Sequence, residues 1–277
     1  MHRKIKIQKA ILTAIMLLFG IFMILPFIWM VSASFKVESD VFKYPIEWIP
    51  SRWNAIENYT QVWFGKFPFY LYYWNSIKVA IFTTAVSVLF SSMAAYGFTK
   101  MQFKGRDVLF FIVLSTYMIP NQATLVPQFL IYRWVGLFDS HIGLVLLSSF
   151  SVLGTFLLRQ FFMGISNEFI EAAKIDGAGH FTTFTRVVMP LMRPAIATYA
   201  ILRFIWTWND YQNPLIFIRS ESKVTLQLGL AKFSDLSGIY YSLIMAGAVS
   251  AILPLLIIFI IGQKQVIEGL SSGGVKG

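Results

Sequence analysis

The chain has 277 residues, of which 57% are hydrophobic and 17% aromatic, with a net charge of +10 and a mean hydropathy of +0.66. A soluble globular domain is less apolar, so the composition favours an integral membrane protein. The sequence has no cysteine and only three, widely separated histidines, which argues against disulfides and zinc sites. The basic residues alternate with apolar runs, a distribution that fits the positive-inside rule better than nucleic-acid binding.

The N-terminal segment predicts a first membrane helix. Residues 1–9 carry four Lys and Arg residues, and residues 11–28 are almost entirely apolar. This run is longer than the core of a usual signal peptide, although the small residues at 32–34 would suit cleavage, so we expect a span that starts in the cytoplasm. Residues 36–72, rich in proline and tryptophan, are typical of an extracytoplasmic loop, in which 53–64 could form a short interfacial helix.

Five further apolar segments predict five more spans. They cover residues 74–98, 108–119 with a shoulder to 134, 142–162, 194–218 and 240–262. Pro120 and Pro127 should kink the shoulder of the third span, where irregular backbone must be covered by protein or line a cavity. The segments expected inside hold 13 Lys and Arg residues against 8 outside, which places both termini in the cytoplasm.

The expected fold is therefore an all-α, multi-pass membrane protein with six transmembrane helices. Residues 1–70 comprise the first span and the extracytoplasmic loop. Residues 71–263 form the remaining transmembrane domain, and residues 264–277 form a cytoplasmic tail. No internal repeat or low-complexity block is evident.

A polar segment between the fourth and fifth spans predicts a short cytoplasmic helix over residues 167–176. Ser166 or Asn167 can cap its first turn, and Gly177 suits its end because glycine tolerates the left-handed conformation. One face is expected to be mostly apolar, with alanines at its centre that let another surface approach closely; its members are Phe169, Ala172, Ala173 and Asp176. We therefore expect a docking helix rather than a linker lying on the membrane surface.

A second helical stripe follows the docking helix. Its apolar positions are Phe181, Phe184, Val188 and Leu191. Because Met189 precedes Pro190, and proline disfavours helical backbone at the residue before it, we expect this stripe to end at Met189.

This region resembles the cytoplasmic loop of bacterial binding-protein-dependent ABC importer permeases. Their motif runs Glu-Ala-Ala, three residues, Gly, nine residues and Ile-x-Leu-Pro; here Glu171-Ala172-Ala173 precedes Gly177, and Val187-Val188-Met189-Pro190 follows, with Val and Met replacing Ile and Leu. The resemblance implies a type I importer (MetI-like) fold with a coupling helix at 167–179. It also implies that the chain engages an ATP-hydrolysing subunit through Glu171, Ala172, Ala173, Asp176, Gly177 and Pro190.

The end of the fifth span is a candidate for part of a translocation path. Its residues are Trp206, Trp208, Asn209 and Asp210. An acid at membrane depth usually faces a cavity, although Asp210 could instead be solvated at the outer interface, and Arg203 lies two helical turns before it. Aromatic, amide and carboxylate groups together suit sugars, and Trp208-Asn209-Asp210 resembles an element of carbohydrate-importer permeases.

The C-terminal tail carries a second resemblance. Residues 268–277 are similar to the C-terminus of the maltose-permease G-type subunits, which implies that Gly273, Gly274, Val275 and Lys276 reach an ATPase interface. Without the resemblance, a glycine-rich tail predicts only a flexible end.

Together these resemblances imply the permease subunit of an ATP-driven sugar importer in the bacterial cell membrane, with an oligosaccharide as the preferred cargo. The sequence has no Gly-x-x-x-x-Gly-Lys-Ser/Thr loop and no hydrolase motif, so we expect no enzyme and no cofactor in this chain, with ATP and Mg²⁺ bound by partners. The implied partners are a second homologous permease, two ATPase subunits, an extracellular sugar-binding lipoprotein and membrane lipid, with no nucleic acid.

Two alternatives remain open from the residues alone. An ion-coupled secondary transporter would need deep polar groups at corresponding positions of two halves, whereas Asp210 is the acid that stands out. A membrane-bound transferase would need a cluster of catalytic acids or histidines in a loop, and Glu221 and Asp235 are too sparse to form one.

Overall fold

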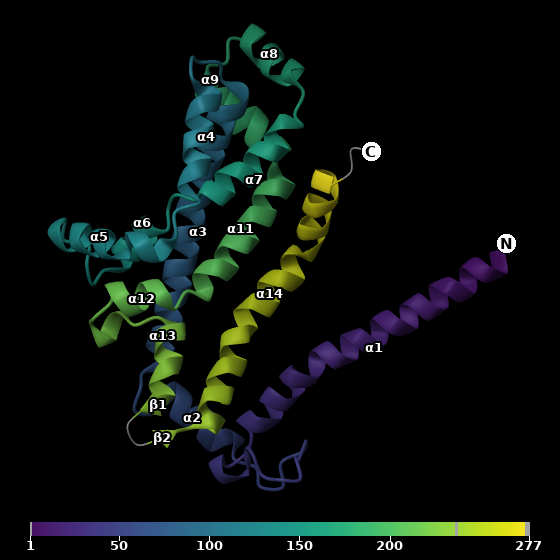
Figure 1. Cartoon of the computed structure of the whole chain (residues 1–277), viewed down its shortest axis with the longest axis vertical. Helices are drawn as coiled ribbons and strands as arrows, with labels where there is room; N and C mark the ends of the chain where they lie inside the picture. The colour runs from purple at the N-terminus through teal and green to yellow at the C-terminus, as the bar shows by residue number, and fades with distance from the viewer. Residues whose placement is uncertain (1, 236–237, 275–277) are drawn as a thin grey trace. The chain divides into compact units, whose positions relative to one another are not determined.

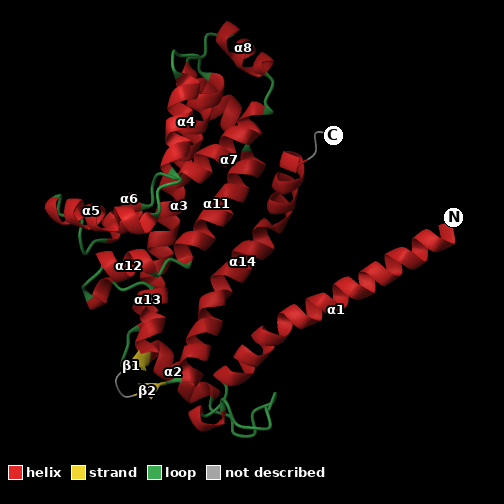
Figure 2. Ribbon diagram, viewed as in Figure 1, coloured by secondary structure: helices red, strands yellow, loops and turns green. Residues whose placement is uncertain are grey.

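The computed structural model describes residues 2–235 and 238–274, and this part of the chain is mainly helical (Figures 1 and 2). The α-helices are α1 (His2–Ser34), α2 (Ala55–Phe64), α3 (Phe69–Lys100), α4 (Arg106–Thr116), α5 (Asn121–Trp134), α6 (His141–Leu147), α7 (Val152–Met163), α8 (Asn167–Ile175), α9 (His180–Thr183), α10 (Met189–Leu191), α11 (Arg193–Trp208), α12 (Gln212–Phe217), α13 (Leu226–Leu230) and α14 (Tyr241–Gly274). Short 3-10 turns are η1 (Glu38–Asp40), η3 (Glu221–Lys223) and η4 (Ala231–Phe233), and η2 (Phe184–Val188) is a π-helical turn. Strands β1 (Ser234–Asp235) and β2 (Gly238–Ile239) pair antiparallel.

The chain divides into two compact units. The first comprises Met1–Tyr70 and Gly229–Leu253, and the second comprises Leu71–Leu228 and Pro254–Gly277. In the first unit, the side chain of Asn58 in α2 donates hydrogen bonds to the carbonyls of Ser34 and Lys36, at 2.9 and 2.8 Å, and so fastens α2 to the end of α1. The carboxylate of Glu38 accepts hydrogen bonds from the backbone amides of Tyr241 and Ser242, where an acid complements the positive end of α14.

The apolar helices provide the expected number of spans. Three are long and apolar enough to cross a membrane unbroken: Gln8–Ser34, Phe69–Lys100 and Tyr241–Gln265. Three helix pairs qualify only together, with bends of 95° between α4 and α5, 51° between α6 and α7, and 82° between His180–Leu191 and α11. Counting each bent pair once gives up to six spans among residues 2–235 and 238–274.

The position of the first bend agrees with the sequence, whereas two other spans are less regular than expected. In the third span α4 ends at Thr116 and α5 begins at Asn121, directly after Pro120, so the break includes the proline that predicts it, whereas Pro127 lies inside α5. The fourth span, expected to be continuous over 142–162, breaks at residues 148–151, and Ser151 caps α7 by accepting a hydrogen bond from the amide of Gly154 at 3.0 Å. The helix expected over 194–218 ends at Trp208 and restarts as α12.

The prediction that the second helical stripe ends at Met189 is wrong. Met189 has φ −58° and ψ −43°, and the helix continues through Pro190 to Leu191. The π-helical turn η2 lies directly before it. Because proline lacks an amide hydrogen and crowds the carbonyl four residues earlier, a wider turn at that point lets the helix pass the proline instead of stopping.

The best packed part of the second unit is an apolar cluster shared by α3, α7, α8, η2 and α11. Its fully buried members include Leu158, Phe162 and Val188, each 0% exposed, and Tyr199 at 1%. The hydroxyl of Tyr199 also lies 2.8 Å from the Ser87 hydroxyl on α3. This cluster holds the docking helix and the fifth span in one packed body.

Candidate functional site

The docking helix expected at 167–176 is α8, and its two ends follow the sequence. The Ser166 hydroxyl accepts a hydrogen bond from the amide of Glu168 at its start. At its end, Gly177 adopts φ +78°, its amide donates to the carbonyl of Lys174, and the amide of Ala178 donates to that of Ala173. This pair of bonds is a Schellman motif, which a glycine in the left-handed conformation closes at least cost.

The inner face of α8 packs into the apolar cluster. Ile170 is 5% exposed and Ala173 is 8% exposed, and both meet the region of Phe184 and Val188 in η2. Because η2 continues through α10 into α11, this face links the docking helix to the fifth span. A displacement of α8 would therefore be transmitted to α11 through tightly packed side chains.

The outer face of α8 is open to solvent. Of the four residues expected on one docking face, Phe169, Ala172 and Asp176 are exposed, whereas Ala173 is buried against the chain itself. Glu171, Gly177 and Pro190 are also exposed, and Ile175 adds an apolar side chain that is 87% exposed. The motif residues thus divide between an inner, structural face and an outer face available to a partner.

The beginning of α8 is fastened to the C-terminal end of α3. The ammonium group of Lys100 donates hydrogen bonds to the carbonyl of Ile165 at 2.6 Å and to the side-chain oxygen of Asn167 at 2.9 Å. Nearby, the guanidinium of Arg159 lies 4.1 Å from the ring centroid of Phe110 in α4. The end of α3 thereby holds the connection on which α8 is mounted.

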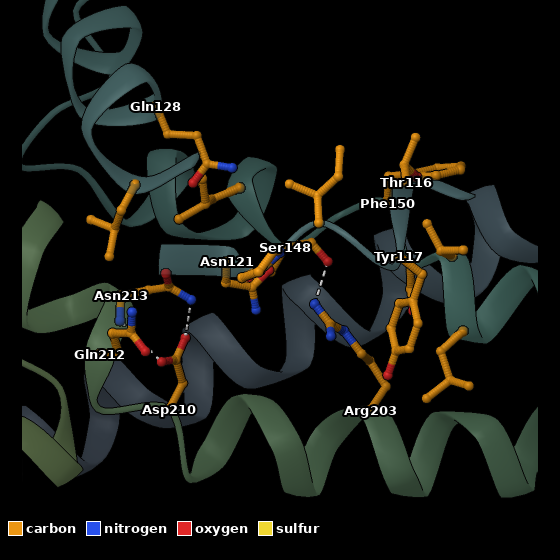
Figure 3. A pocket seen from close by; sticks show the side chains of 17 residues that line it. Thr116, Tyr117, Asn121, Gln128, Ser148, Phe150, Arg203, Asp210, Gln212 and Asn213 are labelled. Atoms are coloured by element: carbon orange, nitrogen blue, oxygen red, sulfur yellow. Dashed lines mark hydrogen bonds between the residues drawn. The ribbon is translucent and has the colours of Figure 1, made fainter. Parts of the chain in front are cut away.

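The same unit contains a cavity of about 680 Å³ (Figure 3). The backbone breaks after α4, α6 and α11 contribute to its wall, which is formed by Thr116, Tyr117, Ile119, Pro120, Asn121, Leu125, Gln128, Leu147, Ser148, Phe150, Ser151, Val152, Leu153, Arg203, Asp210, Gln212 and Asn213. Irregular backbone at membrane depth is tolerated where it lines a water-filled space. The cavity therefore accounts for how these breaks can lie within the spans.

Two charged residues face this cavity, each with a different partner. The guanidinium of Arg203 donates a hydrogen bond to the carbonyl of Ser148, a backbone acceptor freed by the break between α6 and α7. The carboxylate of Asp210 accepts hydrogen bonds from the amide of Asn213 at 3.1 Å and from its side chain at 2.7 Å, which caps α12 (Figure 3). Because α11 ends at Trp208, the two charges are not two turns apart on one helix, as the spacing suggested.

The remaining path candidates do not line the cavity. Trp208 is 1% exposed and its ring stacks on Phe204 and meets Tyr73 edge to face. Trp206 is 41% exposed, and the side chain of Asn209 donates back to the carbonyl of Ile205. Of the four residues singled out in the sequence, Asp210 faces the cavity.

Asp139 joins two loops of the second unit through contacts that no sequence pattern predicted, which we call the Asp139 latch. The carboxylate of Asp139 accepts hydrogen bonds from the amides of Arg219 and Ser220, both at 3.0 Å, and from the Ser220 hydroxyl, while Lys223 lies 3.4 Å away. Burial alone would raise the pKa of Asp139, but these donors and the Lys223 charge together hold that pKa well below its usual range. The carboxylate consequently stays ionised and fastens the start of α6 to the segment after α12.

The tail candidates lie partly outside the described residues. Gly273 and Gly274 belong to the last turn of α14, whereas Val275 and Lys276 are not described. The start of the tail is fastened to α11, because the Thr198 hydroxyl donates to the carbonyl of Gln265 at 2.9 Å. Within residues 2–235 and 238–274, no group of three or more His, Asp or Glu side chains is arranged to hold a metal ion.

A helical unit with broken spans around a polar cavity, joined by packing to the exposed helix α8, fits a membrane transport protein. Residues 87–270 match the model of the family described as binding-protein-dependent transport system inner membrane component. The chain belongs to this family and is a multi-pass protein of the cell membrane.

Named relatives cover almost the whole chain. It is 32% identical to an arabinooligosaccharides transport system permease protein, AraQ, of Bacillus subtilis, over 98% of this chain and 97% of that protein. It is 31% identical to a lactose transport system permease protein, LacG, of Rhizobium radiobacter, over 91% of each. The crystal structure of a bacterial ABC transporter involved in the import of the acidic polysaccharide alginate contains a chain that is similar with a TM-score of 0.81 and 28% identity, over 92% of this chain and 95% of that one.

Proposed function

We propose that this chain is the permease subunit of an ATP-driven importer of oligosaccharides, coupled to its motor through α8. The observation that carries the proposal is the division of α8 into a face buried against η2, which includes Ala173, and an exposed face that bears Glu171 and Ala172 of the Glu-Ala-Ala motif. A helix built in this way can receive a displacement on one side and pass it to the fifth span on the other. The permease itself is a non-catalytic subunit.

The coupling mechanism follows from the packing. A partner that binds Phe169, Ala172 and Ile175 would move α8 as a rigid piece, because the side chains of its inner face, Ile170 and Ala173, are buried in the apolar cluster. The movement would pass through η2 to α11, which carries Arg203 and, beyond its end, Asp210. Closure of the motor would thereby change the cavity as a hinge or shear motion of packed helices.

An oligosaccharide is the best-supported cargo. The relatives that cover almost the whole chain include permeases named for arabinooligosaccharide and lactose transport. The cavity wall supplies amides, hydroxyls and an aromatic ring, which are the groups that bind sugar hydroxyls and sugar faces.

The partners of such an importer are supplied by other chains. The family description implies a binding protein, which we propose to be an extracellular sugar-binding lipoprotein. We further propose a second homologous permease that completes the translocation path, and two ATPase subunits that bind ATP and Mg²⁺, one of them on α8. The tail from Gly273 to Lys276 would reach the interface of these ATPases.

Replacement of Gly177 tests the coupling. An added Cβ at Gly177 meets no atom within 4 Å, so Gly177→Val acts through the backbone, where φ is +78° and a β-branched residue is strained. Gly177→Asn is the matched control, since asparagine tolerates the left-handed conformation. In proteoliposomes that contain the whole transporter, we expect Gly177→Val to lower sugar uptake per ATP hydrolysed at least several-fold and Gly177→Asn to retain most of it. Unchanged coupling in Gly177→Val would contradict the role of α8.

The energy source separates this proposal from an ion-coupled transporter. Uptake of a radiolabelled arabinotriose or lactose by these proteoliposomes should require ATP inside together with the binding protein outside, and should survive dissipation of the ion gradients. Uptake that survives ATP depletion and collapses with an ion gradient would contradict the proposal.

A further inference from the structure

The cavity between the helix breaks holds several polar groups that the fold itself does not use. In the part of the chain that the structure describes, the side-chain amides of Asn121, Gln128 and Gln212 make no hydrogen bond to protein, and Nε of Arg203 has no partner. These groups come from α5, α11 and α12, and they share one cavity in Figure 3. Polar side chains without protein partners that converge on a cavity of this size, within the ~300–1,000 Å³ of small-molecule sites, are characteristic of a binding site.

The charge of the wall restricts the ligand. Arg203 and Asp210 are the charged residues among those that line the cavity, and their formal charges cancel. Both oxygens of Asp210 already accept hydrogen bonds from Asn213, so this carboxylate is fixed in place and repels an acidic ligand that Arg203 alone would attract. An uncharged ligand with many hydroxyls satisfies the amides and Arg203 without this repulsion.

Tyr117 adds an apolar surface to the polar wall. It lies at the end of α4, its side chain is 64% exposed, and it stands beside Arg203 in Figure 3. An aromatic face suits the C–H face of a pyranose or furanose ring, while amides around it suit the ring hydroxyls. The wall thus offers both parts of saccharide recognition.

We propose that this cavity is a subsite for an uncharged saccharide during translocation. Asn121, Gln128 and Gln212 bind its hydroxyls, Arg203 donates to it through the free side of its guanidinium, and Tyr117 lies against a sugar ring. The subsite rests on the proposed import function and adds to it that this permease chain contacts the cargo and selects against acidic sugars.

Cysteine labelling tests the subsite directly because the chain has no native cysteine. The variants are Asn121→Cys, Gln128→Cys and Gln212→Cys in the whole transporter, and the matched control is Gln122→Cys, an exposed neighbour of Asn121 that does not line the cavity. Modification of this chain by a charged methanethiosulfonate is followed by mass, with and without maltotriose as the neutral probe or trigalacturonate as the acidic probe.

We expect maltotriose to slow modification of the three cavity cysteines at least threefold, trigalacturonate to have little effect, and Gln122→Cys to react equally under all conditions. Equal reactivity with and without maltotriose would overturn the subsite, as would cavity cysteines that never react because another chain covers them. Protection by trigalacturonate rather than maltotriose would overturn the assignment to uncharged saccharides.

Transport kinetics distinguish failure of the subsite from failure of the import function. Asn121→Ala and Gln212→Ala each remove one hydrogen bond to a sugar hydroxyl, so the apparent KM for a neutral oligosaccharide that the wild-type transporter carries should rise about threefold to tenfold. Unchanged KM values in both variants, with wild-type uptake intact, would overturn the subsite alone. No ATP-dependent uptake of any saccharide by the wild-type complex would overturn the proposed function.

Discussion

Two regions of the second unit differ in their packing: the packed end around α8 and η2, and the interrupted end around the cavity. Around α8 and η2, bulky apolar side chains such as Phe162, Phe184 and Val188 are buried against one another. Around the cavity, the backbone is interrupted after α4, α6 and α11, and polar side chains face an open space. The packed end is suited to transmit a displacement without loss, because interiors at crystal-like density are stiff. The interrupted end is suited to change shape, since its backbone already departs from the helix.

The largest expected effect comes from overfilling the packed end. A Cβ added to Gly154 on α7 would collide with the ring of Tyr199, which is 1% exposed and held by Ser87, so Gly154→Leu should prevent α7 and α11 from packing. We expect the variant not to assemble, as measured by size-exclusion chromatography of the solubilised transporter. Gly97→Leu is the control, because a Cβ at Gly97 meets no atom within 4 Å. A normally assembled Gly154→Leu complex would show that this end is looser than described.

The second effect tests the inner face of α8. Ile170 is 5% exposed, so Ile170→Ala should leave a cavity and lower the free energy of unfolding by about 2–4 kcal/mol. Phe169→Ala, on the neighbouring but 51% exposed position, should change it by less than about 0.5 kcal/mol. Thermal unfolding of the permease subunits, purified without the ATPase subunits that would cover Phe169, measures both. Equal shifts for the two variants would remove the distinction between inner and outer faces.

The third effect concerns the Asp139 latch and its dependence on pH. The pKa of the Asp139 carboxyl is lower in the folded state than in the unfolded chain. The latch therefore contributes its full stability above the unfolded carboxyl pKa, about 3.9, and loses it as the pH falls through the lower folded pKa. Asp139→Ala should cost about 1–3 kcal/mol at pH 7, because the amides of Arg219 and Ser220 lose their acceptor. The destabilisation should be the same at pH 5 as at pH 7 in thermal unfolding. A difference that vanished already at pH 5 would contradict an ionised, strongly hydrogen-bonded carboxylate.

The smallest effect on stability is expected at the interrupted end. Asn121→Ala and Gln212→Ala should change the free energy of unfolding by less than about 0.5 kcal/mol, since neither amide bonds to protein in the described residues. The same thermal unfolding measurement applies. A large loss of stability would mean that these amides support the fold, and the contrast between the two ends would then be weaker than the structure indicates.

Local patterns predicted much of this architecture. The proline at position 120 marked the break before α5, and Ser166 and Gly177 marked the two ends of α8, because caps and breaks depend on a few neighbouring residues. Local rules failed at Met189, where η2 widened the helix ahead of the proline, and at residues 148–151, where no proline announced the break. In the fourth span, the freed carbonyl of Ser148 is bonded by Arg203 from α11, a partner 55 residues away in sequence.

The sequence by itself determined that the chain is a multi-span membrane protein of the importer-permease family with a short helix between the fourth and fifth spans, since hydropathy, capping residues and the Glu-Ala-Ala motif are local. Only the tertiary structure decided which face of α8 is free, that Trp208 is buried while Asp210 faces a cavity, and that Asn121, Gln128 and Arg203 share that cavity. These are properties of helices brought together at their breaks. Spacing along one helix does not encode them, because each break changes the direction of the helix axis and therefore the direction in which the side chains after the break point.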